Sequence, residues 1–295
     1  AHSYEPSPKD IQAIGKSDLF VYTGGDSDEW VDGMLSSIDK SKLKTLKMMD
    51  TVKLYEEEMS EGMQEEEHEH HHDDKDRHEE DKDHHHDEDK EHHHDDKDRH
   101  DKEHHHDDKE HHHHDGEEGP EMDEHVWTSP ANAIQIVKAL TETISGLDKD
   151  NAQIYQKNAE AYIAKLEKLD KDFHDVIDHA KRKEIIVGDR FPFLYFAKEF
   201  GLTYYAAFPG CSTDTEANPA TIAFLVDKVK EDHIPVVFHI EMSNEQMSKA
   251  IAEATGAKNE LLNAVHNVSD EEFKKGVTYI DLMNHNVKVL KEALN

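Results

Sequence analysis

The longest periodic pattern of apolar positions lies between residues 148 and 182. Apolar and aromatic side chains recur there at spacings of four and three residues, at Tyr155, Ala159, Tyr162, Leu166, Leu169, Phe173 and Val176. No proline or glycine interrupts the pattern, so it predicts one helix of roughly 50 Å at about 1.5 Å per residue. Such a helix could join two lobes and restrict their movement. A coiled-coil dimer seam is less favoured because the heptad fades at both ends.

The N-terminal region predicts a helix followed by a strand. Ser7 supplies a capping hydroxyl, Pro8 suits the first helical turn, and Asp10 is an acid three residues after the cap. The stretch DLFVYTGG at 18–25 is typical of a buried strand closed by two glycines.

A second helix-start signal, Ser129-Pro130, occurs far along the chain. The apolar stripe of the helix that it predicts consists of Ala133, Ile136, Val137 and Leu140. His2 and His125 each stand just ahead of one of the two helix starts.

After residue 183, strand patterns alternate with helix patterns. They are EIIVG, PFLYFAKEFG, TYYAAF, NPATIAFLVDKVKE, IPVVFHI, SNEQMSKAIAEATG, ELLNAV and a last amphipathic helix from about Tyr279. This alternation predicts a parallel sheet with helices on both faces. Ligands of such sheets bind beyond the carboxyl ends of the strands, where Asp189, Glu241 and His266 fall.

One segment, residues 61–124, is dominated by histidine and acidic side chains. It contains 19 of the 27 histidines, repeats HHHDDKDRH at 70–78 and 92–100, and carries 30 acidic against 8 basic residues, which accounts for most of the net charge of −34. So few apolar residues cannot offset the entropy of ordering, and we expect disorder there. The acidity argues against nucleic acid or an anionic membrane surface as a partner and favours a cation.

The candidate chemistry is metal binding rather than catalysis. His68 to His72 match the H-E-x-x-H zinc hydrolase pattern, but the match needs a helix that this composition does not support. No G-x-S-x-G, P-loop or G-x-G-x-x-G motif occurs, and Cys211 is the only cysteine. The segment itself can bind divalent ions weakly, because imidazole suits zinc and carboxylates add charge attraction.

Several motifs, in order, resemble the zinc- and manganese-binding solute receptors of bacterial ABC importers. They are AHSYEPSPKDI, HVWTSPANAIQIVKAL, NAQIYQKNAEAYIAKLEKLD, YFAKEFGL and HNVSDEEFKKGVTYIDLMNHNVKVLKEAL. The resemblance implies an α/β protein with two lobes of mainly parallel sheets, joined by one long rigid helix. We therefore divide the chain into an N-terminal lobe at 1–146, a linking helix at 147–183 and a C-terminal lobe at 184–295. The family's first strand and helix are expected upstream of residue 1, as is a signal segment.

The resemblance also implies a metal-ligand set. His2 and His125 match the family's first two ligands, and His266 falls at the fourth. Arg190 occupies the third position, and a guanidinium cannot ligate. Either water completes the site or a neighbour substitutes, with Asp189 as the first candidate and Glu241 and Cys211 as alternatives. Three imidazoles with an acid or water favour Zn²⁺ over manganese.

The resulting hypothesis is a non-enzymatic, monomeric zinc receptor outside the cytoplasm, either periplasmic or lipid-anchored at the outer face of the membrane. It would capture zinc with high affinity and deliver it to the membrane permease of an ABC importer, while the His-rich segment collects zinc as an accessory. One alternative is a zinc buffer or surface adhesin in which that segment is the main binding element. Another is a zinc hydrolase built on the same three histidines.

Overall fold

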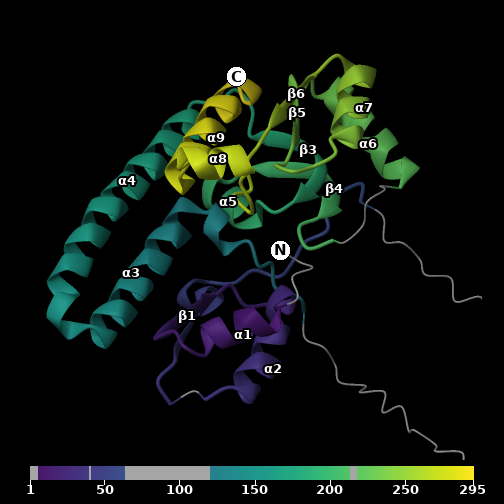
Figure 1. The fold of residues 1–295 in the computed structure, drawn as a ribbon. Helices are drawn as coiled ribbons and strands as arrows, with labels where there is room; N and C mark the ends of the chain where they lie inside the picture. Colours follow the sequence, from purple (N-terminus) through teal and green to yellow (C-terminus); the bar gives the residue numbers. More distant parts are fainter. Residues whose placement is uncertain (1–5, 40, 64–119, 213–217) are drawn as a thin grey trace, which may run out of the picture. The chain divides into compact units, whose positions relative to one another are not determined.

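The computed structural model of the 295-residue chain describes residues 6–39, 41–63, 120–212 and 218–295 (Figure 1). Most of the His- and acid-rich segment and His2 lie outside the described residues. None of the helices within these ranges is long and apolar enough to cross a membrane.

The N-terminal region contains a small parallel sheet. Strand β1 (Leu19–Tyr22) pairs with β2 (Lys44–Lys47), with Leu19 opposite Lys44. Helices α1 (Pro8–Ile14) and α2 (Trp30–Ser37) precede and follow β1. The predicted cap of α1 is confirmed, because the Ser7 hydroxyl and the Asp10 carboxylate each accept the other residue's backbone N–H. A separate core fills this region, made of Val31, Met34, Leu35 and Leu43.

Short 3₁₀ turns connect several of the elements. They are η1 (Asp26–Asp28), η2 (Met48–Thr51), η3 (Val126–Thr128) and η4 (Lys149–Asn151).

Two long helices follow the His-rich segment. Helix α3 (Pro130–Leu147) and helix α4 (Ala152–Asp178) lie side by side (Figure 1). The predicted long helix is confirmed as the uninterrupted α4, whose 27 residues span about 40 Å. It begins four residues later and ends four residues earlier than the pattern indicated, and at its start Asp148 caps the turn η4 instead. The C-terminal half of α4 buries its apolar stripe, including Leu166, Leu169 and Phe173.

The C-terminal region is a four-stranded parallel sheet with the order β4-β3-β5-β6. Its strands are β3 (Glu184–Phe191), β4 (Thr203–Pro209), β5 (Val236–His239) and β6 (Lys258–Leu261). Its helices are α5 (Leu194–Phe200), α6 (Pro219–Glu231), α7 (Gln246–Thr255), α8 (Asp270–Lys275) and α9 (Tyr279–Ala293). The predicted α/β class with parallel strands is confirmed.

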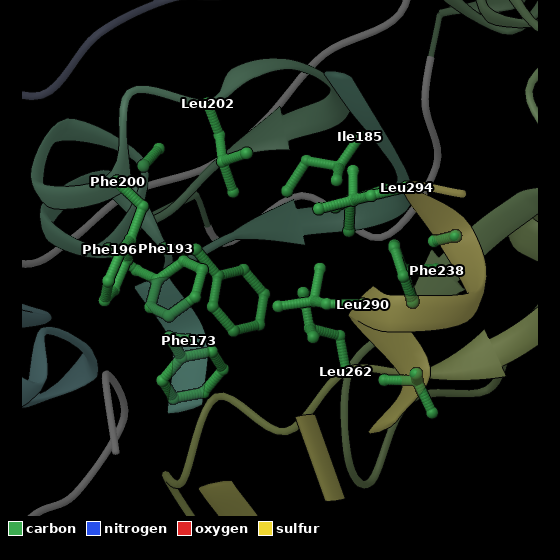
Figure 2. Close-up of a cluster of buried hydrophobic side chains, with 14 of the residues drawn as sticks. Phe173, Ile185, Phe193, Phe196, Phe200, Leu202, Phe238, Leu262, Leu290 and Leu294 are labelled. Carbon is green, nitrogen blue, oxygen red and sulfur yellow. The ribbon is translucent and has the colours of Figure 1, made fainter. Parts of the chain in front are cut away.

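Two apolar cores cover the two faces of this sheet. One contains Phe173 of α4, Phe238 of β5 and Leu290 of α9, together with aromatic residues of α5 and the turn before it (Figure 2). The other joins Val237 of β5 to side chains of α6 and α7, including Leu225. With both faces packed, the carboxyl ends of the strands remain the natural place for a ligand site.

The predicted disordered segment extends too far at its C-terminal end. Asp123 and Glu124, inside the predicted range 61–124, are 1% and 4% exposed. Their strand-like stretch pairs with the chain before the segment, through an antiparallel bridge between Glu56 and Met122 and a backbone hydrogen bond from Asp123 to Tyr55. The low apolar content misled the prediction, because the burial of these acids depends on hydrogen bonds rather than hydrophobicity.

Candidate metal centre

Two of the predicted ligands, His125 and His266, come together in the structure. Their ring centroids are 4.8 Å apart, and the planes are nearly perpendicular at 85°. His125 immediately precedes η3 and is fully buried, whereas His266 lies in the loop that follows β6. Trp127 packs against both rings, with each centroid distance equal to 5.5 Å.

His125 is oriented by Asp123. One oxygen of Asp123, Oδ1, accepts the backbone N–H of His125 at 2.8 Å and lies 3.1 Å from Nδ1 of its ring. Both side chains are almost completely buried. A proton on Nδ1 completes this hydrogen bond, which makes Nε2 the nitrogen that can ligate a metal. Asp123 was not among the predicted site residues, although an acid two residues before a candidate ligand is a usable signal.

His266 is held by Glu241 through its backbone, while its ring nitrogen lies beyond hydrogen-bond distance of that carboxylate. Oε1 of Glu241 accepts the backbone N–H of His266 at 2.6 Å and lies 3.7 Å from its Nδ1. The same carboxylate accepts N–H groups from Ala264 at 2.7 Å and Asn267 at 3.4 Å. Glu241 was one of the alternative third ligands, and in this structure its carboxylate holds the His266 loop.

Trp127 ties the two histidine segments together. Its indole Nε1 donates to the carbonyl of Ala264 at 2.9 Å, and its own carbonyl accepts from the Tyr279 hydroxyl at 2.8 Å. Burial raises the pKa of Tyr279 above its ordinary value, so this hydroxyl remains a donor. The loop after β6, the segment before α3 and the start of α9 are therefore joined beside the two rings.

Asp189, the first candidate for the third ligand, lies at an irregularity in β3. The pairing of β3 with β4 shifts register between Val187 and Arg190. Oδ1 of Asp189 accepts the backbone N–H of Arg190 at 2.8 Å, and Oδ2 accepts the hydroxyl of Ser243. Within the described part of the chain, its hydrogen bonds go to these groups rather than to either histidine. Ligation by Asp189 and by His2 stays a prediction.

Asp189 and Glu241 lie at the carboxyl ends of two neighbouring strands, β3 and β5, where a ligand site is expected. Strand β3 is followed by β4 on one side, and the chain then crosses to β5 on the other side. The carboxyl ends of β3 and β5 therefore form the topological switch point, where open parallel sheets bind their ligands. The bond between Ser243 and Asp189 connects the two strand ends.

Cys211, the remaining alternative ligand, lies with Glu57 and Glu121. The possible ligand atoms of these three side chains are within 4.8 Å of one another, and Glu57 accepts the backbone N–H of Cys211 at 2.7 Å. Burial, with Glu57 and Asp123 nearby, raises the pKa of the Cys211 thiol. The thiol is then protonated at neutral pH, and a thiol is a poorer ligand than a thiolate.

Gly210 allows the chain after β4 to approach His125 closely. A Cβ at this position would lie 3.2 Å from Cε1 of His125 and 3.1 Å from Oδ2 of Asp123. A side chain would therefore press on the histidine and on the acid that orients it. No pattern in the sequence distinguishes this glycine from one that only ends a strand.

Comparisons with known proteins identify the family. Residues 1–293 match the family model described as the periplasmic zinc-uptake complex component A. The chain is 33% identical over 293 residues to the high-affinity zinc uptake system protein ZnuA of Bacillus subtilis. The aligned part covers 99% of this chain and 77% of that protein. It is 30% identical over 294 residues to the zinc-binding lipoprotein AdcA of Streptococcus pneumoniae, again covering 99% of this chain. The chain spans about half the length of AdcA, 49%.

Solved structures show the same fold. The Zn(II)-bound ZnuA-like domain of Streptococcus pneumoniae AdcA is similar with a TM-score of 0.68 and 27% identity, covering 99% of this chain and 86% of that one. The metal-dependent lipoprotein YcdH of Bacillus subtilis is similar with a TM-score of 0.70 and 29% identity, covering 100% and 87%. Because the family model matches nearly the whole chain, residues 1–293, the chain belongs to the zinc-uptake complex component A family.

Proposed function

We propose that this protein captures zinc outside the cytoplasm and delivers it to the membrane permease of an ABC importer. The observation that carries the proposal is the His125 and His266 pair, in which each histidine has a carboxylate beside its Nδ1. In this proposal Nε2 of each imidazole binds a shared ion, and the carboxylate of Asp123 raises the basicity of His125 as a ligand. The names of the family and of its relatives AdcA and ZnuA support zinc as the cargo.

The donor set favours zinc over manganese. Imidazole nitrogen suits zinc, whereas manganese prefers more oxygen ligands. Tetrahedral zinc needs one or two further ligands, for which we propose His2 and Asp189. Asp189 would have to exchange its bond with Ser243 for the metal, which a carboxylate at a strand end can do by rotating its side chain.

No chemical bond needs to be made or broken in this role. The relatives compared above are named for zinc binding and uptake, which supports a receptor rather than an enzyme. The His-rich segment would act as an accessory, because 19 histidines on one short stretch raise the local zinc concentration near the centre. We propose that the receptor works as a monomer.

The test is a zinc competition titration on the full chain. A chelator with nanomolar affinity removes zinc from weak sites in the His-rich segment, so only a tight site is recorded. We expect His125→Ala and His266→Ala each to weaken the tight site by more than roughly 100-fold, since loss of a ligand exceeds the usual loss for an orienting partner. His179→Ala, at the exposed histidine that caps the C-terminus of α4, is the matched control. Equal affinities in all variants would move the binding function to the His-rich segment.

A further inference from the structure

We propose that Glu241 is a positioning residue for zinc binding, which holds Val265 in a left-handed backbone conformation and thereby places His266 beside His125. The inference rests on the proposed function, because it concerns the same ion. It assigns to Glu241 the geometry of the loop rather than a bond to the metal.

Val265 has an unusual backbone conformation. Its φ is +59°, in the left-handed region that glycine and asparagine tolerate and that a β-branched side chain strongly disfavours. Val265 is partly buried and packs against the apolar core of the C-terminal region. Such strain persists only where the surroundings determine the conformation. Here the strained residue directly precedes the proposed ligand His266.

Glu241 supplies the contacts that hold Val265 in this backbone conformation. Oε2 accepts the N–H of Ala264, on one side of Val265, and Oε1 accepts the N–H of His266, on the other side. The Glu241 side chain is only 10% exposed, so these charge-assisted bonds are shielded from water. The carbonyl of Ala264 is fixed separately by Trp127.

The consequence for the metal is geometric. Both oxygens of Glu241 accept backbone N–H groups on either side of Val265, so the carboxylate fixes the course of the loop. Without it, Val265 would relax toward a negative φ, and the rotation would carry His266 with it. Zinc–nitrogen bonds are about 2.0 to 2.1 Å long, so a small displacement of the ring removes a ligand.

A double-mutant cycle tests this role against a purely electrostatic one. Glycine adopts positive φ without strain, so Val265→Gly removes the reason for the loop to relax. We expect Glu241→Ala to weaken zinc binding by roughly 10- to 100-fold, the usual range for a residue that orients a ligand. Measured against Val265→Gly alone, the affinity loss caused by Glu241→Ala should be at least about threefold smaller than in the wild-type background, because glycine populates the left-handed conformation without the carboxylate.

The measurement is chelator competition on the full chain, beside a thermal melt of each metal-free variant. Glu253→Gln, an exposed acid of α7, controls for the loss of one negative charge. If Glu241→Ala is unfolded at the assay temperature, Glu241→Gln replaces it, and its zinc affinity is compared with and without Val265→Gly. An affinity loss that Val265→Gly does not relieve, or no loss at all, overturns the positioning role.

The outcomes also separate this inference from the proposed function. If the wild-type protein has no tight zinc site, the proposed function fails. If the wild type binds tightly and His266→Ala does not, but Glu241→Ala binds like the wild type, only the role of Glu241 fails.

Discussion

Replacing Glu199 with glutamine should change how stability depends on pH. Glu199 lies on α5, and its Oε1 accepts the backbone N–H of Ala131 in the first turn of α3 at 3.2 Å. Burial raises the pKa of Glu199 to about 7, and the negative charge of Asp170 on α4 acts in the same direction. Hydrogen bonds from Ser129 and Ala131 oppose the shift. The folded protein therefore favours the protonated, neutral form of the Glu199 carboxyl, which lies between α3, α4 and α5.

The sign and size of the effect follow from this pKa. The folded protein holds the proton more tightly than the unfolded chain, where a glutamate has its ordinary pKa of 4.5. Stability is therefore highest at low pH and is lost as the pH rises from 4.5 to about 7. Ionisation of Glu199 therefore lowers the free energy of unfolding by about 3 kcal/mol at pH 8, and by less than about 1 kcal/mol at pH 5.

Glutamine imitates the protonated carboxyl, since it keeps an acceptor for Ala131 and gains a donor toward Asp170. Urea unfolding with a chelator present, so that bound zinc does not contribute, should show Glu199→Gln more stable than the wild type by about 3 kcal/mol at pH 8. The two proteins should converge toward pH 5. Glu167→Gln, an exposed acid of α4, should follow the wild type at every pH. Parallel pH profiles for Glu199→Gln and the wild type would refute the reasoning.

Four further predictions concern the metal centre and the core. Asp123→Asn should weaken zinc binding by roughly 10- to 100-fold in a competition titration, because it orients His125; an unchanged affinity would remove Asp123 from the site. Deleting 66–118 should leave one tight site and remove several weak ones by calorimetry, and loss of the tight site would contradict the accessory role. Affinity should fall between pH 7.5 and 5, because protons compete for imidazole; a flat profile would count against histidine ligands. Leu290→Ala, at a fully buried position, should cost about 2 to 5 kcal/mol in urea unfolding, and a cost below about 1 kcal/mol would show that the core can collapse around it.

Elements with strong local signals could be predicted from the sequence. The apolar spacing of α4 and the capping residues of α1 and α3 act within a few residues, so they remain readable without the rest of the fold. Strand β2 was missed, because KTLK is short and contains no buried residue, and it becomes a strand by pairing with β1 rather than through its own composition. Its pattern is no stronger than that of an ordinary loop.

The metal centre divides in the same way. His125 and His266 were found through motifs that the family shares, and the structure brings them together. Asp123 and Gly210 were not found, since an acid and a glycine acquire their roles only when distant segments approach. Glu241 was noticed at a strand end, but its hydrogen bonds to the His266 loop depend on the turn at Val265, which no residue type there signals.

The two acids give the centre its rigidity before any metal arrives. Each accepts the backbone N–H of its histidine and so fixes the main chain that carries the ring, and Asp123 also bonds the ring of His125. The entropy of ordering these ligands is then lost when the protein folds rather than when zinc binds, which strengthens binding. A site organised in this way should retain zinc well, and release must come from a change in the ligands that complete it. For that step the proposed ligand Asp189 is the one to examine, because its carboxylate already has Ser243 as an alternative partner.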